Sequence, residues 1–173
     1  MPNQITQIAG TQLFVAPIDD QDDLPVAVAD YSGARNAGST APATGGKVGT
    51  WLEVAELQEL GEFGREYNLV TYSSLAKRGT DKFKGTYNDG SFSVPVGRDD
   101  DDPGQNLMNT ALNNDDKYAF CVRFPGGTSS ASSGADFFVG LVTNFRSQGG
   151  GLDAILFKQL TVELTSTPLT DNS

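Results

Sequence analysis

Apolar residues recur at every second position in several short runs of this chain, which is the period of a β-strand with one buried face. The run Lys117–Phe124 shows it through Tyr118, Phe120 and Val122, and the run ending in Leu164 shows it again. Turns are plentiful, because 20 of the 173 residues are glycine and 8 are proline. The pattern predicts a mainly β fold, and this length fits one domain with its own core.

Further strands are expected elsewhere in the chain, at Leu13–Val15, Trp51–Leu60, Asp136–Arg146 and Leu152–Thr165. A helix is the alternative for the second of these, but the flanking Gly49 and Gly61 favour a strand that contains a bulge. In the third, we expect the apolar side chains to share one face of the strand, namely Phe137, Val139, Leu141 and Phe145.

The segment Lys82–Val96 carries the clearest local signal of a β-hairpin, because apolar residues alternate on both sides of Asn88-Asp89-Gly90. With Asp89-Gly90 as a two-residue loop, Tyr87 is expected to face Phe92, and Phe83 to face Val96.

A short helix is predicted to begin after Asp102, because proline follows it and Gln105 stands three residues later. This is the spacing of an N-cap, a proline at the first helical position and a capping partner. Its apolar stripe consists of Leu107, Met108, Ala111 and Leu112.

A long loop is predicted at residues 18–49, where Asp, Ala, Gly, Ser, Thr and Pro dominate and Tyr31 is the only aromatic residue. So little apolar surface does not offset the entropy of ordering the chain. We expect the loop to be mobile alone and to become ordered against a partner, with permanent disorder as the alternative. Residues 166–173 form a polar C-terminal tail.

The absence of histidine excludes a Ser-His-Asp triad and histidine-based zinc sites, and one cysteine excludes a thiolate cluster. Cys121 lies in an alternating run and is interpreted as a small packed residue. The alternative is a reactive thiol beside Arg123. We therefore expect no catalytic residues.

Two short motifs resemble ligand sites, and both have simpler interpretations. Gly45-Gly46-Lys47 lacks the serine or threonine and the earlier glycine of a phosphate-binding loop. The run Asp99–Asp102 is interpreted as a solvated turn that caps the following helix, and a divalent-cation site is the alternative. We expect no metal and no cofactor.

The chain is acidic, with a net charge of −10 from 12 basic and 22 acidic residues. Affinity for nucleic acid comes mostly from lysine and arginine, so this balance argues against a nucleic-acid-binding protein. No run is apolar and long enough to cross a bilayer, and we expect a protein made in the cytoplasm without a membrane anchor.

Several segments resemble the major tail tube protein of long non-contractile-tailed bacteriophages, the siphophage tail tube family. They are Trp51-Leu52-Glu53-Val54, Asn68-Leu69-Val70-Thr71, the helix after Pro103, the run Tyr118–Pro125 and Phe138-Val139-Gly140-Leu141-Val142. The resemblance covers roughly residues 10–165.

The resemblance implies a single tail-tube-like domain over residues 1–173, with two antiparallel sheets packed as a β-sandwich or split barrel, one flanking α-helix and long loops. The type VI secretion tube protein is related to this family. The implied function is that of a structural virion protein, which self-assembles into stacked hexameric rings and forms the tube through which DNA is ejected into the host. Implied partners are copies of itself, a tape measure protein, and tail terminator or tail-tip proteins.

The resemblance also gives the acidic residues a role, because a wall of carboxylates repels DNA that passes without specific binding. The candidate lumen-facing residues are Glu53, Glu56, Glu59, Asp99, Asp100, Asp101 and Asp102. The candidate inter-subunit residues of the long loop are Asp19, Asp20, Asp22, Asp23, Tyr31 and Arg35.

Two other classes of protein are alternatives. One is a monomeric β-sandwich that binds carbohydrate, with Trp51, Tyr31, Tyr67 or Tyr72 as stacking platforms. The other is an enzyme, which is disfavoured because no arrangement of a nucleophile with its base is recognisable.

Overall fold

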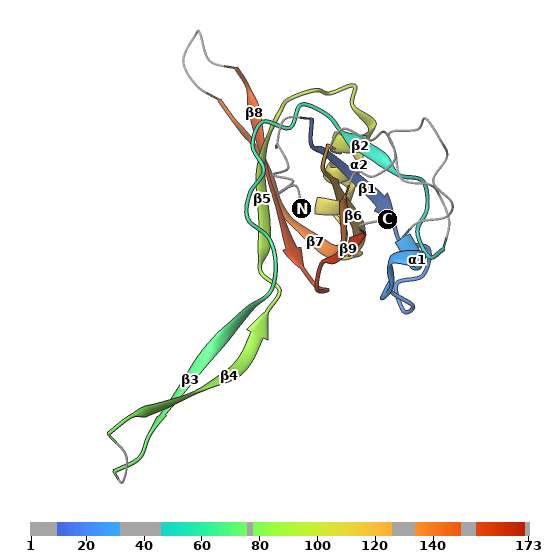
Figure 1. The fold of residues 1–173 in the computed structure, drawn as a ribbon. Helices are drawn as coiled ribbons and strands as arrows, with labels where there is room; N and C mark the ends of the chain where they lie inside the picture. Colours follow the sequence, from blue (N-terminus) through green and yellow to red (C-terminus); the bar gives the residue numbers. More distant parts are fainter. Residues whose placement is uncertain (1–9, 32–45, 76–77, 126–133, 150–154, 172–173) are drawn as a thin grey trace, which may run out of the picture.

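The computed structural model describes residues 10–31, 46–75, 78–125, 134–149 and 155–171, which form nine strands and two helices (Figure 1). In chain order the elements are β1 (Gln12–Pro17), α1 (Val28–Tyr31), β2 (Leu52–Val54), β3 (Glu66–Ser73), β4 (Thr80–Asn88), β5 (Ser91–Gly97), α2 (Pro103–Leu112), β6 (Tyr118–Arg123), β7 (Ala135–Gln148), β8 (Phe157–Leu164) and β9 (Leu169–Asp171).

Most strands belong to one antiparallel sheet with the order β2-β1-β6-β7-β8-β5, and β9 also pairs with β7. The strands β3 and β4 form a second, two-stranded antiparallel sheet. The predicted mainly β fold, with two antiparallel sheets and a flanking helix, is confirmed.

The large sheet curls so that its two ends approach each other. The chain after β2 turns at Glu56, whose φ is 61°, and Leu57 then forms an antiparallel bridge with Val96 of β5. The backbone N–H of Gly97 donates to the carbonyl oxygen of Glu56 at 2.8 Å. This contact joins opposite ends of the strand order without making a closed barrel. The predicted strand Trp51–Leu60 is therefore correct only for Leu52–Val54, and irregular backbone follows it.

The sheet is buried on both faces along β1 and β6, and β6 shows this most directly. Its Phe120 and Val122 belong to one buried cluster, here called the first cluster. Ala119 and Cys121 belong to another on the opposite face, here called the second cluster. All four side chains have no exposed surface. The period-two alternation predicted for this strand therefore separates two apolar clusters rather than a core from solvent.

The second cluster is covered by part of the predicted long loop. Tyr31 of α1 is fully buried, and its ring centroid lies 5.3 Å from that of Phe137 on β7. The indole N–H of Trp51 donates to the backbone carbonyl of Tyr31 at 3.2 Å. The prediction of a mobile loop is thus wrong for α1, because these aromatic contacts supply apolar burial that the local composition lacks. Residues 32–45 lie outside the described part.

The strand β7 contains a bulge that changes which face its side chains occupy. Its pairing register with β8 shifts between Val142 and Asn144. As a result, Phe137 and Val139 pack in the second cluster, while Phe145 packs in the first. The expectation of one shared face was wrong because an extra residue reverses the alternation.

The predicted hairpin Lys82–Val96 is not formed, because β4 and β5 pair with different partners. β4 pairs with β3, so that Tyr87 lies opposite Tyr67. β5 pairs with β8, which places Phe92 opposite Val162. The intervening Asn88–Gly90 is a junction at which the chain enters the large sheet: the N–H of Leu164 donates to the carbonyl of Gly90 at 3.0 Å.

The predicted helix is confirmed as α2, with Asp102 as its N-cap and Pro103 in its first turn. Met108 and Ala111 are fully buried in the first cluster, whereas Leu112 at the end of the stripe is exposed. Gln105 was expected as the capping partner, but its Oε1 accepts from the N–H of Asp99 at 3.2 Å and its Nε2 donates to the carbonyl of Gly97 at 2.8 Å. The helix is thereby held against the end of β5.

Candidate functional site

The strands β3 and β4 project from the body as a two-stranded ribbon, here called the arm and defined as residues 66–88 (Figure 1). Within the described residues these strands pair only with each other. An isolated two-stranded hairpin is marginally stable in water. A hairpin held out from the body, with apolar side chains on it, is therefore a surface suited to a partner.

One face of the arm carries an apolar patch made of Val70, Tyr72 and Phe83, with 50%, 59% and 56% of their surfaces exposed. Val70 lies directly opposite Phe83, and Tyr72 is two residues further along the same strand face. Leu75 lies beyond the end of β3 and is fully exposed. A contiguous apolar patch on a projecting element is typical of an interaction site.

The other face carries alternating cations and aromatic rings. The guanidinium carbon of Arg65 lies 3.7 Å from the ring centroid of Tyr87. The rings of Tyr87 and Tyr67 are 5.7 Å apart, and the Lys84 ammonium lies 4.7 Å from the Tyr67 ring. These cation–π contacts stiffen the half of the arm nearest the body.

A bulge in the arm depends on a glycine. The register shifts between the Tyr67 and Leu69 pairs, so that β4 contains one residue more than β3 over this stretch. A Cβ on Gly85 would lie 2.8 Å from Cγ2 of Val70. Glycine at this position therefore lets the two strands approach beside the apolar patch.

The arm differs in charge from the rest of the protein. Residues 66–88 contain four basic and two acidic side chains, a net charge of +2. Because the whole chain carries −10, the remaining 150 residues carry −12. The arm and the rest of the chain therefore carry net charges of opposite sign.

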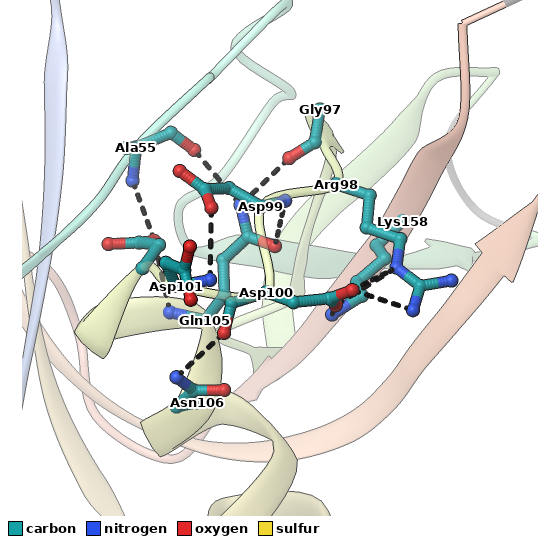
Figure 2. A network of polar contacts seen from close by, with 10 residues as sticks. Ala55, Gly97, Arg98, Asp99, Asp100, Asp101, Gln105, Asn106 and Lys158 are labelled. Atoms are coloured by element: carbon teal, nitrogen blue, oxygen red, sulfur yellow. Dashed lines mark hydrogen bonds and ion pairs between the residues drawn. The ribbon is translucent and has the colours of Figure 1, made fainter.

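Ala55, which lies between Glu53 and Glu56 in the chain, is held beside the aspartate run at the start of α2 (Figure 2). The N–H of Ala55 donates to the Asp102 carboxylate at 3.1 Å, and the N–H of Gln58 donates to the carbonyl of Pro95 at 3.2 Å. The segment that holds Glu53, Glu56 and Glu59 therefore packs against the segment that leads into Asp99–Asp102. All three glutamates are exposed.

The four aspartates have different surroundings. Asp102 is buried and caps α2, so it is not available to line a lumen, which corrects its place among the lumen-facing candidates. Asp100 is exposed, and hydrogen bonds from Arg98, with a further contribution from Lys158, lower the pKa of its carboxyl. Asp99 accepts a hydrogen bond from the N–H of Asp101 at 3.0 Å, and Asp101 is exposed.

No set of three acidic, histidine or cysteine side chains within the described residues is placed to hold a metal ion. In that same part of the chain, neither helix is long and apolar enough to cross a bilayer.

The aspartates of the predicted inter-subunit loop, Asp19, Asp20, Asp22 and Asp23, are exposed. Asp23 forms an ion pair with Lys47 at 2.5 Å across the base of the loop. Tyr31 is buried within the subunit, so its expected role in an inter-subunit contact is wrong. Arg35 lies outside the described residues.

The stacking platforms proposed for a carbohydrate-binding module are not brought together. Trp51 and Tyr31 are buried, with 4% and 0% of their surfaces exposed. Tyr67 and Tyr72 are exposed, but they are five residues apart on β3 and therefore lie on opposite faces of the arm.

The arm itself was missed as a site by the sequence reasoning. Its signal is present in the sequence: aromatic and aliphatic residues such as Leu69, Tyr72 and Phe83 stand within a segment that holds four of the twelve basic residues. Such a segment combines the residues of a strand with the charge of an exposed surface, which is typical of a strand outside the core.

The sequence matches no protein-family model and no curated protein, whereas its fold is similar to several solved structures. A chain of the anti-feeding prophage (AFP) baseplate, from a 6-fold symmetrised cryo-EM structure, superposes with a TM-score of 0.65 at 9% identity, over 98% of both chains. The SPP1 tail tube protein superposes with a TM-score of 0.58 at 13% identity, over 96% of this chain and 80% of that one. A crystal structure of an Hcp protein gives a TM-score of 0.42 at 12% identity, over 95% of this chain and 100% of that one.

Proposed function

We infer from the fold shared with the SPP1 tail tube and AFP baseplate proteins that this chain is a structural subunit, whose copies associate into a tail-tube-like assembly. In its full form the proposal is that hexameric rings stack into a phage tail tube through which DNA is ejected. The protein is then made in the host cytoplasm and resides in the virion, where tape measure, tail terminator or tail-tip proteins are its further partners.

The observation that carries this proposal is the arm. In a monomer, Val70, Tyr72 and Phe83 stay exposed on the arm, so their apolar surface does not stabilise the fold. A second copy that covers this patch removes that surface from water. Burial of apolar surface contributes roughly 25 cal/mol per Å², so an interface built on these side chains supplies favourable free energy for association.

Charge supports the same partner. The arm carries +2 and the rest of the chain −12, so two arms repel each other weakly while an arm and an acidic body attract. Head-to-tail contact of this kind joins unlike surfaces of identical copies and generates rings or stacked arrays.

The acidic surface has a separate role in the proposal. Glu53, Glu56, Glu59, Asp99, Asp100 and Asp101 are the remaining candidates for a lumen wall. Carboxylates on such a wall repel phosphates, and DNA then passes without binding.

The experiment that tests self-association compares three purified proteins by light scattering and negative-stain microscopy over a range of concentrations. They are the wild type, a Val70→Asp/Phe83→Asp variant, and an Ile155→Asp control, which places a charge at an exposed apolar residue outside the arm. Rings or tubes are expected from the wild type and the control but not from the arm variant. A wild type that stays monomeric throughout overturns the proposal, and an arm variant that assembles normally shows that the arm is not the contact.

A further inference from the structure

The arm meets the body at a junction that brings three segments of the chain together. Arg65 stands just before β3 and Asp89 just after β4, and Arg65 Nε donates to Asp89 Oδ1 at 2.7 Å. The third member is Thr167, which follows β8. Its hydroxyl donates to the same Asp89 oxygen at 3.2 Å and accepts a hydrogen bond from the Arg65 guanidinium.

The Thr167 side of this junction is fixed to the large sheet. The N–H of Thr165 donates to the carbonyl of Val139 at 2.9 Å, and the N–H of Val139 donates to the Ser166 hydroxyl at 2.8 Å. Two residues after Thr167, Leu169 pairs with Phe137 as β9 begins. The segment first interpreted as a polar tail therefore includes a strand of the sheet, and it holds Thr167 in a defined position.

The two backbone connections between arm and body each contain a glycine at the junction. Gly64 precedes Arg65 with a φ of 140°, and Gly90 follows Asp89 with a φ of 80°. A Cβ on Gly90 would lie 3.1 Å from the carbonyl oxygen of Gly64, so the two connections pass close together. Paired glycines allow the backbone to change direction at low cost, which is the property of a hinge.

Arg65 transmits the position of the junction into the arm. Its guanidinium lies over the ring of Tyr87, which packs in turn on Tyr67 at 5.7 Å. The cation that holds Asp89 and Thr167 therefore also holds the first cross-strand aromatic pair. Its side chain is only 27% exposed and that of Asp89 12%.

We propose that Arg65, Asp89 and Thr167 form a clamp across a two-glycine hinge, and that this clamp sets the direction of the arm before a second copy binds. The proposal deepens the proposed function and rests on it where assembly is concerned. If the arm samples about ten directions and only one of them can bind a second copy, about one tenth of the molecules are competent to bind. The apparent affinity is then lowered about tenfold. Arg65 and Thr167 are thus positioning residues for association rather than contact residues.

The direct test measures the arm in the dilute monomer by pulsed electron paramagnetic resonance. Spin labels are placed at Leu75→Cys, beyond the end of β3, and at Glu163→Cys, an exposed position on β8. The native Cys121 is buried, and labelling of the protein without the two new cysteines measures any background reaction at it. A narrow distance distribution is expected for the labelled wild type and for Thr167→Ser, which keeps the hydroxyl. A distribution at least twice as broad is expected for Thr167→Val, which keeps the shape, and for Arg65→Ala. A Thr167→Val distribution as narrow as that of the wild type overturns the clamp.

A second measurement separates the clamp from the proposed function. The critical concentration for assembly of the unlabelled proteins is expected to rise about tenfold in Thr167→Val and to stay unchanged in Thr167→Ser. An unchanged critical concentration in Thr167→Val overturns the positioning role. A wild type that never assembles, but whose distances respond to the substitutions as expected, refutes the proposed function and leaves the clamp established.

Discussion

The carboxylate of Asp102 accepts a hydrogen bond from the backbone N–H of Ala55 at 3.1 Å, although 47 residues separate the two. The same carboxylate accepts from the N–H groups of Gly104 at 3.3 Å and Gln105 at 3.1 Å. The Asp102 side chain therefore caps α2 and also ties the start of this helix to the segment after β2 that closes the curled sheet. Figure 2 shows the network around Ala55 and Gln105.

Replacement of Asp102 by alanine is expected to lower the free energy of unfolding by about 2–4 kcal/mol. Loss of an N-cap costs about 1 kcal/mol, and a buried N–H left without an acceptor costs about 1–3 kcal/mol. Urea unfolding followed by circular dichroism measures the change. Asp101→Ala is the control, because that side chain is exposed, and an equal loss in both variants contradicts the double role of Asp102.

Replacement of Gly104 by alanine is expected to destabilise the protein although alanine favours helices. A Cβ there would lie 2.1 Å from the carbonyl oxygen of Glu53, which is backbone and belongs to β2. The gain in helix propensity is about 1 kcal/mol, whereas overpacking costs about 1–3 kcal/mol, and a backbone clash this short puts the cost at the upper end. Gly79→Ala, which meets nothing within 4 Å, is expected to change stability by less than about 0.5 kcal/mol in the same unfolding assay. A Gly104→Ala protein as stable as the wild type contradicts the close packing of α2 on β2.

Alkaline pH is expected to destabilise the protein through Tyr31. Burial raises the pKa of its hydroxyl from 10.0 to about 12. The folded state therefore holds this proton more tightly than the unfolded state, so the contribution is complete below pH 10 and is lost as pH rises from 10 to 12. At pH 11 the loss is about 1.4 kcal/mol.

Urea unfolding at several pH values between 8 and 11 checks this expectation. Tyr31→Phe removes the hydroxyl and should flatten the alkaline part of the stability curve. Tyr72→Phe, in an exposed residue of the arm, should leave it as in the wild type. If the Tyr31→Phe curve keeps the full slope, the buried hydroxyl is not its source.

Assembly is expected to depend on the basic charge of the arm. Lys82→Glu with Lys84→Glu changes the arm from +2 to −2 and turns its attraction to an acidic body into repulsion. Arg146→Glu with Lys117→Glu makes the same change in total charge outside the arm. Light scattering should show weaker assembly for the first pair than for the second. The wild type should assemble less well at about 0.5 M salt than at about 0.05 M, because salt screens surface charges; equal behaviour of the two pairs contradicts the electrostatic contact.

The sequence was sufficient where neighbouring residues determine the structure. The strand Gln12–Pro17, the strand Tyr118–Arg123 and the capped helix after Asp102 follow from alternation, burial and capping within a few residues. The same local rules found the acidic turn and gave the correct interpretation of Asp102 as a cap.

The sequence was insufficient where distant segments decide the outcome. Alternation around Asn88-Asp89-Gly90 indicates two strands there, but it does not determine which strands they pair with. Phe92 lies opposite Val162 of β8 and not opposite Tyr87. Tyr31 looked isolated because its partners Phe137 and Trp51 are far away in the chain. The arm was hidden for the same reason, since its apolar side chains resemble those of a core strand until the strand pairing is known.

The arm contributes no side chain to either buried cluster in the described part of the chain. Substitutions at its tip therefore carry little cost for the folding of the body, whereas a change at almost any residue of β6 disturbs packing on one of its two buried faces. Selection can accordingly alter the exposed surface of the arm while the framework stays constant. Proteins that share this scaffold are therefore expected to differ most in sequence along β3 and β4.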